Sequence, residues 1–437
     1  MGQIEEPVIF KPEYSWEFLS ADEIEAKSVR AVRNHVKHIK ATSPWYNRVL
    51  ADIDPEIITT PDEIKKLPFT DRTMVNANPA SFLAVPREDI VESVLSSGSI
   101  HRPILFHMTA GDLDRLAFSQ ALSLWSMGVS NNDRLQVLMS FENLLLPAMG
   151  VYRGAILLGA TATRAGIVPP AIQTLLFKQA APTIIAGNPL YLRRLGQELI
   201  KAGVDTKSLG IEKIICTGEP IRTADLSANA LQRSIASTFD VADIFASYTF
   251  TESAGDYSEC SAQSGCHSHP ELVYTEVIDS RGAPVPDGVI GELVITPLGI
   301  EGMPVLRYKT GDLTFRVSEP CSCGRKSCRI GPIMGRAAQI LTVKGTSLYQ
   351  LSLTNALDEM DGLDDYCVVV EAEGLRESVT IHAAMPASMV EPVMSHVRNK
   401  LGISIPVLVS NTPTINSIRG ERGKLCRFVD RRVRVMI

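Results

Sequence analysis

Helix-like and strand-like runs alternate between residues 112 and 216 of this chain. The runs with helical periodicity are 112–127, 145–158, 169–179 and 190–202, and the short apolar runs typical of strands are 134–140, 160–163, 183–186 and 213–216. This alternation predicts an α/β fold in which most strands are parallel. Ligand-binding loops are then expected at the carboxyl ends of those strands.

Two of these strand ends carry side chains that suit a pocket for a small organic acid. Phe141 and Asn188 follow the first and third strands, and Ile215 lies on the fourth. A lining that includes Phe141 and Ile215 favours an aryl or otherwise apolar acid over a charged one. The alternative is that Phe141 and Asn188 belong to ordinary connections in which turn geometry selects the residue type.

A Thr-Gly-Asp sequence at residues 310–312 follows another strand-like run, 291–296. The carboxylate of Asp312 offers paired acceptor oxygens, which suit the two hydroxyls of a ribose. Alone, the tripeptide would be interpreted as a polar turn. Further short motifs accompany it in the chain: serine-rich residues 96–99, Tyr-Thr-Phe-Thr-Glu at 248–252, Gly-Arg at 335–336 and Gly-Lys at 423–424.

In this order the motifs resemble those of the adenylate-forming enzymes and, within them, the phenylacetate–CoA ligase branch. The resemblance extends from Pro44 to Asp430. It implies a large multi-layer α/β N-terminal domain, residues 1–334, and a small mobile α+β C-terminal domain, residues 335–437. It also implies ATP, Mg²⁺, coenzyme A and a small carboxylic acid as ligands. Ala337 and Ala338 replace the family's polar hinge pair, which weakens the inference of a large domain rotation.

The serine-rich segment follows a strand-like run, 92–95, and matches the phosphate loop of the family. A loop of small residues exposes backbone N–H groups to phosphate oxygens, and hydroxyl groups add donors. Ile100 and His101 replace a threonine and a glycine of the family pattern, so we expect a stiffer loop with one phosphate contact fewer. The resemblance assigns phosphate binding to Ser96, Ser97, Gly98, Ser99 and Arg102.

The other nucleotide contacts are also implied by the resemblance. Glu252 matches the carboxylate that holds Mg²⁺, a cation that prefers oxygen ligands, and Thr251 matches a hydroxyl near the α-phosphate. Lys424 matches a mobile lysine that offsets charge while acyl-AMP forms. Residues 243–246 are predicted as a strand that carries the 248–252 motif on a loop. The adenine and ribose contacts are assigned to Gly218, Glu219, Pro220, Ser247, Tyr248, Thr249, Asp312 and Arg336.

Five of the 8 cysteines lie between residues 260 and 328. In a cytosolic protein, which keeps its thiols reduced, such clustering favours metal binding over disulfides. The resemblance selects four ligands for a closed, structural Zn²⁺ site, namely Cys260, His267, Cys321 and Cys323. Cys266, His269 and Cys328 compete for the same role. The alternative is a set of reduced, buried thiols without a metal.

Charge and hydropathy exclude several other classes of protein. The net charge of −6 gives no basic footprint for nucleic acid. The longest apolar region, 135–162, is interrupted by polar residues and a proline, so we expect no membrane span. The N-terminus has no basic and apolar signal, which favours a cytoplasmic location. The oligomeric state is left open, a homodimer included.

The sequence therefore favours an AMP-forming acid–CoA ligase that activates an aromatic or apolar acid through an acyl-adenylate. A second hypothesis is an adenylating enzyme that passes the acyl group to an amine or a carrier protein. A third is a nucleotide-binding homologue with little activity.

Overall fold

A computed structural model describes residues 12, 15–96, 103–142, 146–317, 319–343, 346–373, 376–420 and 427–432. The chain forms two compact units. The first comprises residues 1–219, 235–310 and 314–331, and the second comprises residues 220–234, 311–313 and 332–437. The predicted boundary between domains at 334/335, and the mobility of the smaller one, stay predictions. No helix in the described parts of the chain combines the length and apolar character needed to cross a membrane.

A nine-stranded sheet forms the centre of the first unit, and its strand order is β14-β15-β10-β9-β8-β7-β6-β4-β5. Neighbouring strands in the part β8-β7-β6-β4-β5 are parallel. Neighbouring strands in the part β14-β15-β10-β9-β8 are antiparallel. The predicted α/β class is thus confirmed. The strand bounds are β4 Arg134–Leu138, β5 Thr161–Arg164, β6 Ile184–Gly187, β7 Lys213–Thr217, β8 Asp243–Phe250, β9 Gly255–Ser258, β10 Cys266–His267, β14 Arg316–Val317 and β15 Arg329–Ile330.

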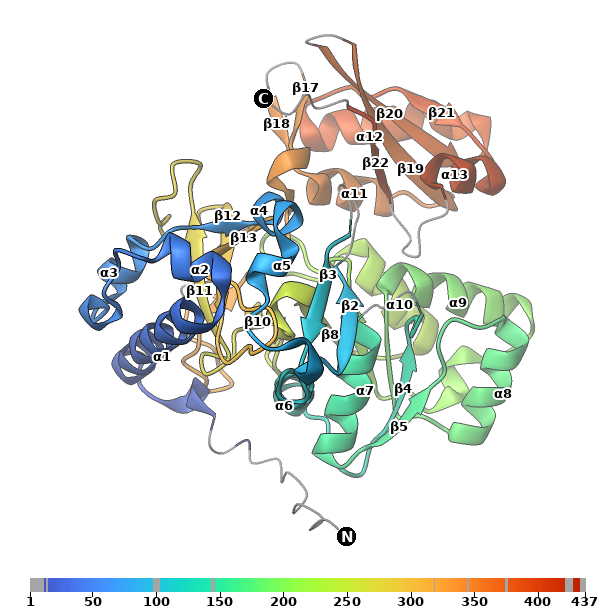
Figure 1. Ribbon diagram of the computed structural model, residues 1–437. Coiled ribbons are helices and arrows are strands. Elements are labelled where there is room, and N and C mark those ends of the chain that lie inside the picture. The colour runs from blue at the N-terminus through green and yellow to red at the C-terminus, as the bar shows by residue number, and fades with distance from the viewer. Residues whose placement is uncertain are drawn as a thin grey trace. The chain divides into compact units, whose positions relative to one another are not determined.

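Helices cover both faces of the parallel strands (Figure 1). Apolar residues of α6 (Ala110–Ser126) and α7 (Leu146–Leu158) pack with alternate strand residues such as Val137 and Phe245 in one core cluster. On the other side lie α8 (Pro170–Ala180) and α9 (Pro189–Lys201), each with a proline in its first turn, where the missing N–H costs nothing. Apolar residues therefore appear on both sides of these strands, as is typical of parallel sheets.

The eight elements predicted between residues 112 and 216 are confirmed within a few residues. The prediction for residues 247–250 as a loop is wrong, because β8 continues to Phe250 and pairs with β9. Several other elements were not predicted, two of them near the assigned residues. Strand β3 (Leu105–Met108) pairs with β2 (Glu92–Leu95), so the serine-rich segment connects a hairpin, and α10 spans Ala230–Phe239.

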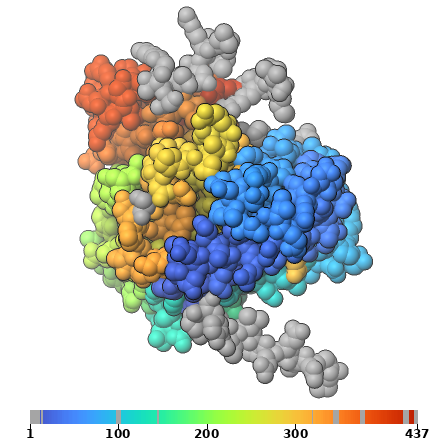
Figure 2. Space-filling view, turned by 90° about the vertical axis from the view of Figure 1, so that its left-hand side faces the viewer, coloured from blue at the N-terminus to red at the C-terminus, as the bar shows by residue number. Residues whose placement is uncertain are grey.

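A second sheet, which belongs mostly to the first unit, brings together strands distant in sequence in the order β1-β13-β12-β11, with residues 311–313 of β13 grouped in the second unit. Their bounds are β1 Thr70–Asp71, β11 Val273–Ile278, β12 Gly291–Pro297 and β13 Tyr308–Thr314. The N-terminal helices pack beside it, and Figure 2 shows these blue residues against the yellow β11–β12 turn. The helices are α1 Ala21–Thr42, α2 Pro44–Val49, α3 Pro61–Lys65, α4 Arg72–Ala77 and α5 Pro79–Phe82. Helix α1 begins with a Ser20–Glu23 capping box, in which each side chain accepts from the backbone N–H of the other residue.

The second unit contains a four-stranded sheet in the order β21-β20-β19-β22. It combines a β19–β20 hairpin with helices, as expected of the α+β class predicted for this region. A separate apolar core includes Leu353, Val368 and Val393, from α11, β19 and α12. The bounds are β16 Gly335–Arg336, β17 Leu341–Val343, β18 Thr346–Leu348, α11 Gln350–Asp358, β19 Asp365–Glu373, β20 Arg376–Ala384, α12 Val390–Leu401, β21 Val407–Val409, α13 Thr412–Arg419 and β22 Phe428–Asp430.

Arg307 joins the N-terminal segment to the second sheet of the first unit. Its side chain is 1 % exposed and makes two hydrogen bonds, of 2.9 and 2.8 Å, to the carboxylate of Glu276. It also donates to the carbonyl oxygens of Lys65 and Leu67, at 2.7 and 2.6 Å. A buried charge is tolerated when its donors are satisfied in this way. Arg307 therefore fixes the chain immediately before β1.

We expect Arg307→Met to destabilise the protein by about 3–5 kcal/mol, because it leaves the Glu276 carboxylate buried without a cation. The midpoint of urea denaturation measures the effect. Arg281→Met is the matched control, since Arg281 is 86 % exposed and pairs with Asp279 at the surface. Equal midpoints for the two variants would contradict the assignment.

Candidate functional site

The predicted magnesium ligand Glu252 lies in a short helical turn, Thr251–Ser253, between β8 and β9. The turn ends at Ala254, whose φ of 41° lets the chain reverse into β9. Only 8 % of Glu252 is exposed. Its carboxylate accepts a hydrogen bond from the hydroxyl of Tyr308 at 3.1 Å and lies 3.6 Å from the guanidinium of Arg72. Burial and the neighbouring Glu252 carboxylate raise the pKa of Tyr308, so the phenol stays a donor.

The same turn is joined to the β2–β3 hairpin. The hydroxyl of Thr251 donates to the carbonyl of Leu95 at 3.2 Å. The hydroxyl oxygen of Ser96 accepts hydrogen bonds from Ile104 N at 2.9 Å and from Arg72 at 2.8 Å. Ser96 is therefore held at the base of the predicted phosphate loop, beside the Glu252 turn. The other loop residues assigned by the resemblance lie outside the described residues: Ser97, Gly98, Ser99 and Arg102.

A cavity of about 10 Å³ lies against this turn, which is about the room that one water molecule needs. Its lining combines residues of the turn with side chains from β3, from the start of α6 and from the segment between β12 and β13. The lining residues are Phe106, His107, Met108, Asp112, Thr251, Glu252, Ala254, Ile300 and Met303.

The residues assigned to the adenine side lie on or after neighbouring strands. Ser247 is buried and donates to Asp256 at 3.1 Å, so its hydroxyl has a structural partner. The ring of Tyr248 is half-buried, with its centroid 5.2 Å from that of Phe250. Thr249 lies on β8 with its hydroxyl 3.4 Å from that of Thr217.

Gly218 follows β7 with a φ of 93°, a conformation that favours glycine, and Glu219 comes next. The carbonyl of Pro220, which the structure groups with the second unit, accepts a hydrogen bond from Asn229 at 3.1 Å.

The residues assigned to an acid pocket have different environments. Phe141 packs edge-on against Tyr152, with ring centroids 6.3 Å apart. Ile215 is 3 % exposed, and Phe141 packs partly buried against the same core cluster. Asn188 caps α9, because its side-chain oxygen accepts from Leu190 N at 3.0 Å. The capping geometry gives Asn188 a structural role at the carboxyl end of β6.

Asp312 and Arg336 face each other in the second unit. The two residues are opposite one another in the antiparallel pair of β13 and β16, and Arg336 Nε lies 3.1 Å from Asp312 Oδ1. The carboxylate and the guanidinium offer complementary acceptors and donors to a polar ligand. Lys424, the predicted mobile lysine, lies outside the described residues.

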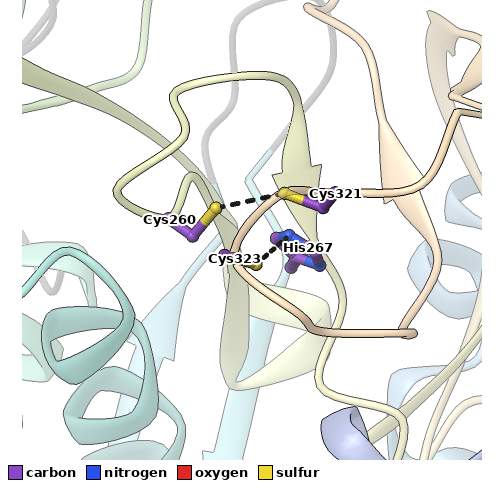
Figure 3. Close-up of side chains that lie close together, drawn as sticks. All are labelled: Cys260, His267, Cys321 and Cys323. Atoms are coloured by element: carbon purple, nitrogen blue, oxygen red, sulfur yellow. Dashed lines mark hydrogen bonds between the residues drawn. The ribbon is translucent and has the colours of Figure 1, made fainter.

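Four side chains of the cysteine-rich region converge (Figure 3). The ligand atoms of Cys260, His267, Cys321 and Cys323 all lie within 4.8 Å of one another. The Cys260 and Cys321 sulfurs are 3.5 Å apart, as are Cys323 Sγ and His267 Nε2. A tetrahedral Zn²⁺ ion keeps such atoms about 3.5–3.8 Å apart. Burial lowers the pKa of His267 to about 4, so the imidazole is neutral, which is the form that binds metals. The donor set fits zinc.

The three competing ligands have other partners. Cys266 Sγ lies 3.7 Å from the carbonyl of Ala246, and Cys328 Sγ lies 3.8 Å from that of Arg329. Both ring nitrogens of His269 are engaged, Nδ1 with Glu17 at 2.6 Å and Nε2 with Ser123 at 2.8 Å. The ring of His267 contacts Ser327 through Nδ1 at 3.0 Å, which leaves Nε2 directed at the cluster.

Sequence analysis missed a buried contact beside this cluster. Glu17, which is fully buried, accepts from Arg325 Nε at 2.6 Å as well as from His269. Burial alone would raise the pKa of Glu17, but the charges and hydrogen bonds of His269 and Arg325 outweigh it and hold the pKa below its ordinary value. Glu17 lies 308 residues from Arg325, so no local pattern could have linked them.

Comparison with known proteins reveals similarity over nearly the full chain. No protein-family model matches. Phenylacetate-coenzyme A ligase from Thermus thermophilus is 27 % identical over 97 % of this chain and 100 % of the relative, and phenylacetate-coenzyme A ligase from Pseudomonas putida is 27 % identical over 94 % and 97 %. The chain is thus similar to phenylacetate–CoA ligases along nearly its whole length. The resemblance inferred from the motifs is thus confirmed.

The fold of this chain also has solved counterparts. A 2-hydroxyisobutyryl-CoA ligase structure, in the postadenylation state in complex with R3-HIB-AMP, superposes with a TM-score of 0.85. It covers 97 % of this chain and 95 % of the other, at 21 % identity. At that identity the likeness concerns the fold, and it agrees with the two-unit α/β architecture described above.

We expect Glu17→Gln to lower stability near neutral pH, because it leaves Arg325 and His269 without their anion. The pKa of Glu17 is lowered on folding, so its contribution is present above its unfolded pKa of about 4.3 and is lost as pH falls through the lower folded value. Denaturation midpoints measured from pH 7 down to pH 3 should therefore converge for the variant and the parent at the acid end.

Glu198→Gln, in an exposed i,i+4 pair with Arg194, is the control for this experiment. A constant gap between Glu17→Gln and the parent protein at all pH values would contradict the role of the Glu17 charge.

Proposed function

We propose that this protein is an AMP-forming acid–CoA ligase. The observation that carries the proposal is similarity to phenylacetate-coenzyme A ligases over 97 % of this chain and 100 % of a relative. Two contacts support it: Arg72 bridges Ser96 and Glu252, and Thr251 joins the Glu252 turn to Leu95, the residue before Ser96. In the proposed reaction an acid carboxylate attacks the α-phosphorus of ATP, which gives acyl-AMP and releases pyrophosphate. The thiol of CoA then attacks the acyl carbon, and AMP leaves as the thioester forms.

Each assigned residue has a task in these two steps. Glu252 is suited to hold Mg²⁺, because its carboxylate supplies hard oxygen ligands, and the cation would neutralise phosphate charge. Ser96 can donate its hydroxyl proton to a phosphate oxygen, whereas the Thr251 hydroxyl, which donates to the Leu95 carbonyl, joins the Glu252 turn to the end of β2. The resemblance assigns Asp312 and Arg336 to the ribose. Lys424 offsets charge on the α-phosphate while the acyl-adenylate forms.

An aromatic or apolar acid is the proposed substrate class. Phe141 and Tyr152 place two rings at the carboxyl end of β4, where ligands of parallel sheets bind. The phenylacetate named for the relatives is an acid of this class. We also propose a cytoplasmic location and two domains with a boundary near residue 334. A homodimer stays a prediction.

We further propose that Cys260, His267, Cys321 and Cys323 hold a structural Zn²⁺ ion. All four ligand positions are occupied by protein atoms, which is typical of closed structural sites and leaves no place for a reacting water. The ion would crosslink the segment of β9 and β10 to residues 321–323.

The proposed function is tested by ATP–pyrophosphate exchange with a panel of aromatic and aliphatic acids, followed by addition of CoA. We expect exchange with at least one aromatic acid, and CoA-dependent formation of AMP and a thioester. Lys424→Ala should reduce exchange by about 100-fold or more, because an electrostatic contact to the reacting phosphate is lost.

Arg398→Ala, on α12, serves as the control for loss of an exposed positive charge. Exchange without a thioester would indicate another acyl acceptor, such as an amine or a carrier protein. Absence of exchange with every acid would overturn the enzyme assignment.

For the metal, we expect about one zinc ion per chain after purification in metal-free buffers, measured by elemental analysis. Cys321→Ser should lose it and melt at a lower temperature, because the thiolate ligand is gone. Cys328→Ser should retain zinc, since Cys328 lies outside the convergent set. Zinc-free protein whose melting is unaffected by a chelator would contradict the site.

A further inference from the structure

Arg72 occupies a fixed position at the start of α4. The residues before it, Thr70 and Asp71, pair in register with Tyr308 and Lys309 of β13. The carboxylate of Asp71 caps the helix by accepting from Met74 N at 2.8 Å. A strand pairing on one side and a capped helix on the other therefore set the direction of the Arg72 side chain.

The guanidinium of Arg72 bridges two groups that the resemblance assigns to the triphosphate. One terminal nitrogen donates to Ser96 Oγ at 2.8 Å, and the other lies 3.6 Å from the Glu252 carboxylate. Its side chain is 17 % exposed, and that of Glu252 is 8 % exposed, so water screens the pair only partly. Neither sequence motif contains this residue.

The contacts of Ser96 show what the bridge achieves. The hydroxyl oxygen accepts from Arg72 and from Ile104 N, which fills both of its acceptor positions. Among the residues that the structure describes, none accepts the Ser96 proton, which can therefore be donated to a phosphate oxygen. The Glu252 carboxylate is likewise held in place by the guanidinium of Arg72 and the hydroxyl of Tyr308, and carboxylate oxygens are the ligands that Mg²⁺ prefers.

We propose that Arg72 is a positioning residue for a metal-bound nucleoside triphosphate. This proposal rests on the proposed function. Arg72 acts through Ser96 and Glu252: it orients the serine hydroxyl as a donor and holds the carboxylate, together with Tyr308, in place for the cation. Preorganisation of this kind lowers the cost of binding, because the groups need not rearrange when the ligand arrives.

The test compares Arg72→Met, which keeps the apolar stem and removes the charge, with Arg72→Lys, which keeps the charge and loses the planar fork. Arg87→Met, an exposed arginine on the same N-terminal segment, is the control. We expect Arg72→Met to raise the KM for ATP and the Mg²⁺ concentration at half-maximal exchange by about tenfold or more. The KM for the acid should stay within about twofold. Arg72→Lys should recover part of the loss, and Arg87→Met should match the parent.

Isothermal titration of Mg·ATP, which needs no turnover, separates this proposal from the proposed function. Weaker Mg·ATP binding by Arg72→Met supports the positioning role even if no acid supports exchange, in which case only the ligase assignment fails. Unchanged Mg·ATP affinity, or equal rises in the KM values for ATP and the acid, would overturn it. A lower melting temperature with unaltered KM values would reduce Arg72 to a structural residue. A parent protein that binds no Mg·ATP would overturn both proposals.

Discussion

The buried pair of Arg307 and Glu276 is the contact from which the site in the first unit is built. Arg307 holds the carbonyls of Lys65 and Leu67, and the next residues along the chain pair with β13 as strand β1. This pairing brings the Tyr308 hydroxyl within hydrogen-bonding distance of the Glu252 carboxylate, and it places the Arg72 guanidinium next to the same carboxylate. An ion pair in the interior thus sets the geometry of polar groups that are themselves only slightly exposed.

The electrostatics around Glu252 follow from this arrangement. A carboxylate with 8 % exposure would be costly if it were unpaired, so a phenol donor and a nearby guanidinium are what make it tolerable. The same environment suits catalysis, since fixed dipoles and charges in a partly dry site interact more strongly with phosphate and metal than they would in water. Stability and proposed function therefore use the same contacts.

The cysteine cluster also depends on contacts between segments that are distant in sequence. Its four ligands come from two separate stretches of chain, and Arg325, two residues after Cys323, is held by the buried Glu17. Glu17 joins the N-terminal segment to Arg325 and His269 through charged contacts. The proposed metal would join residues 260–267 to residues 321–323. In this region, contacts between segments distant in sequence therefore add to the stability that apolar packing supplies.

The sequence alone determined whatever depends on local periodicity or on short motifs. The alternating elements of residues 112–216 follow from apolar spacing, and the family resemblance of the short motifs selected the four cysteine and histidine residues that converge. Only the tertiary structure decided that β8 extends to Phe250, because pairing with β9 stabilises it, and that Asn188 caps a helix. Arg72, Arg307 and Glu17 could not be assigned beforehand. Their partners lie 24 to 308 residues away along the chain, and a charged side chain acquires its role only from the groups that folding brings within a few ångströms of it.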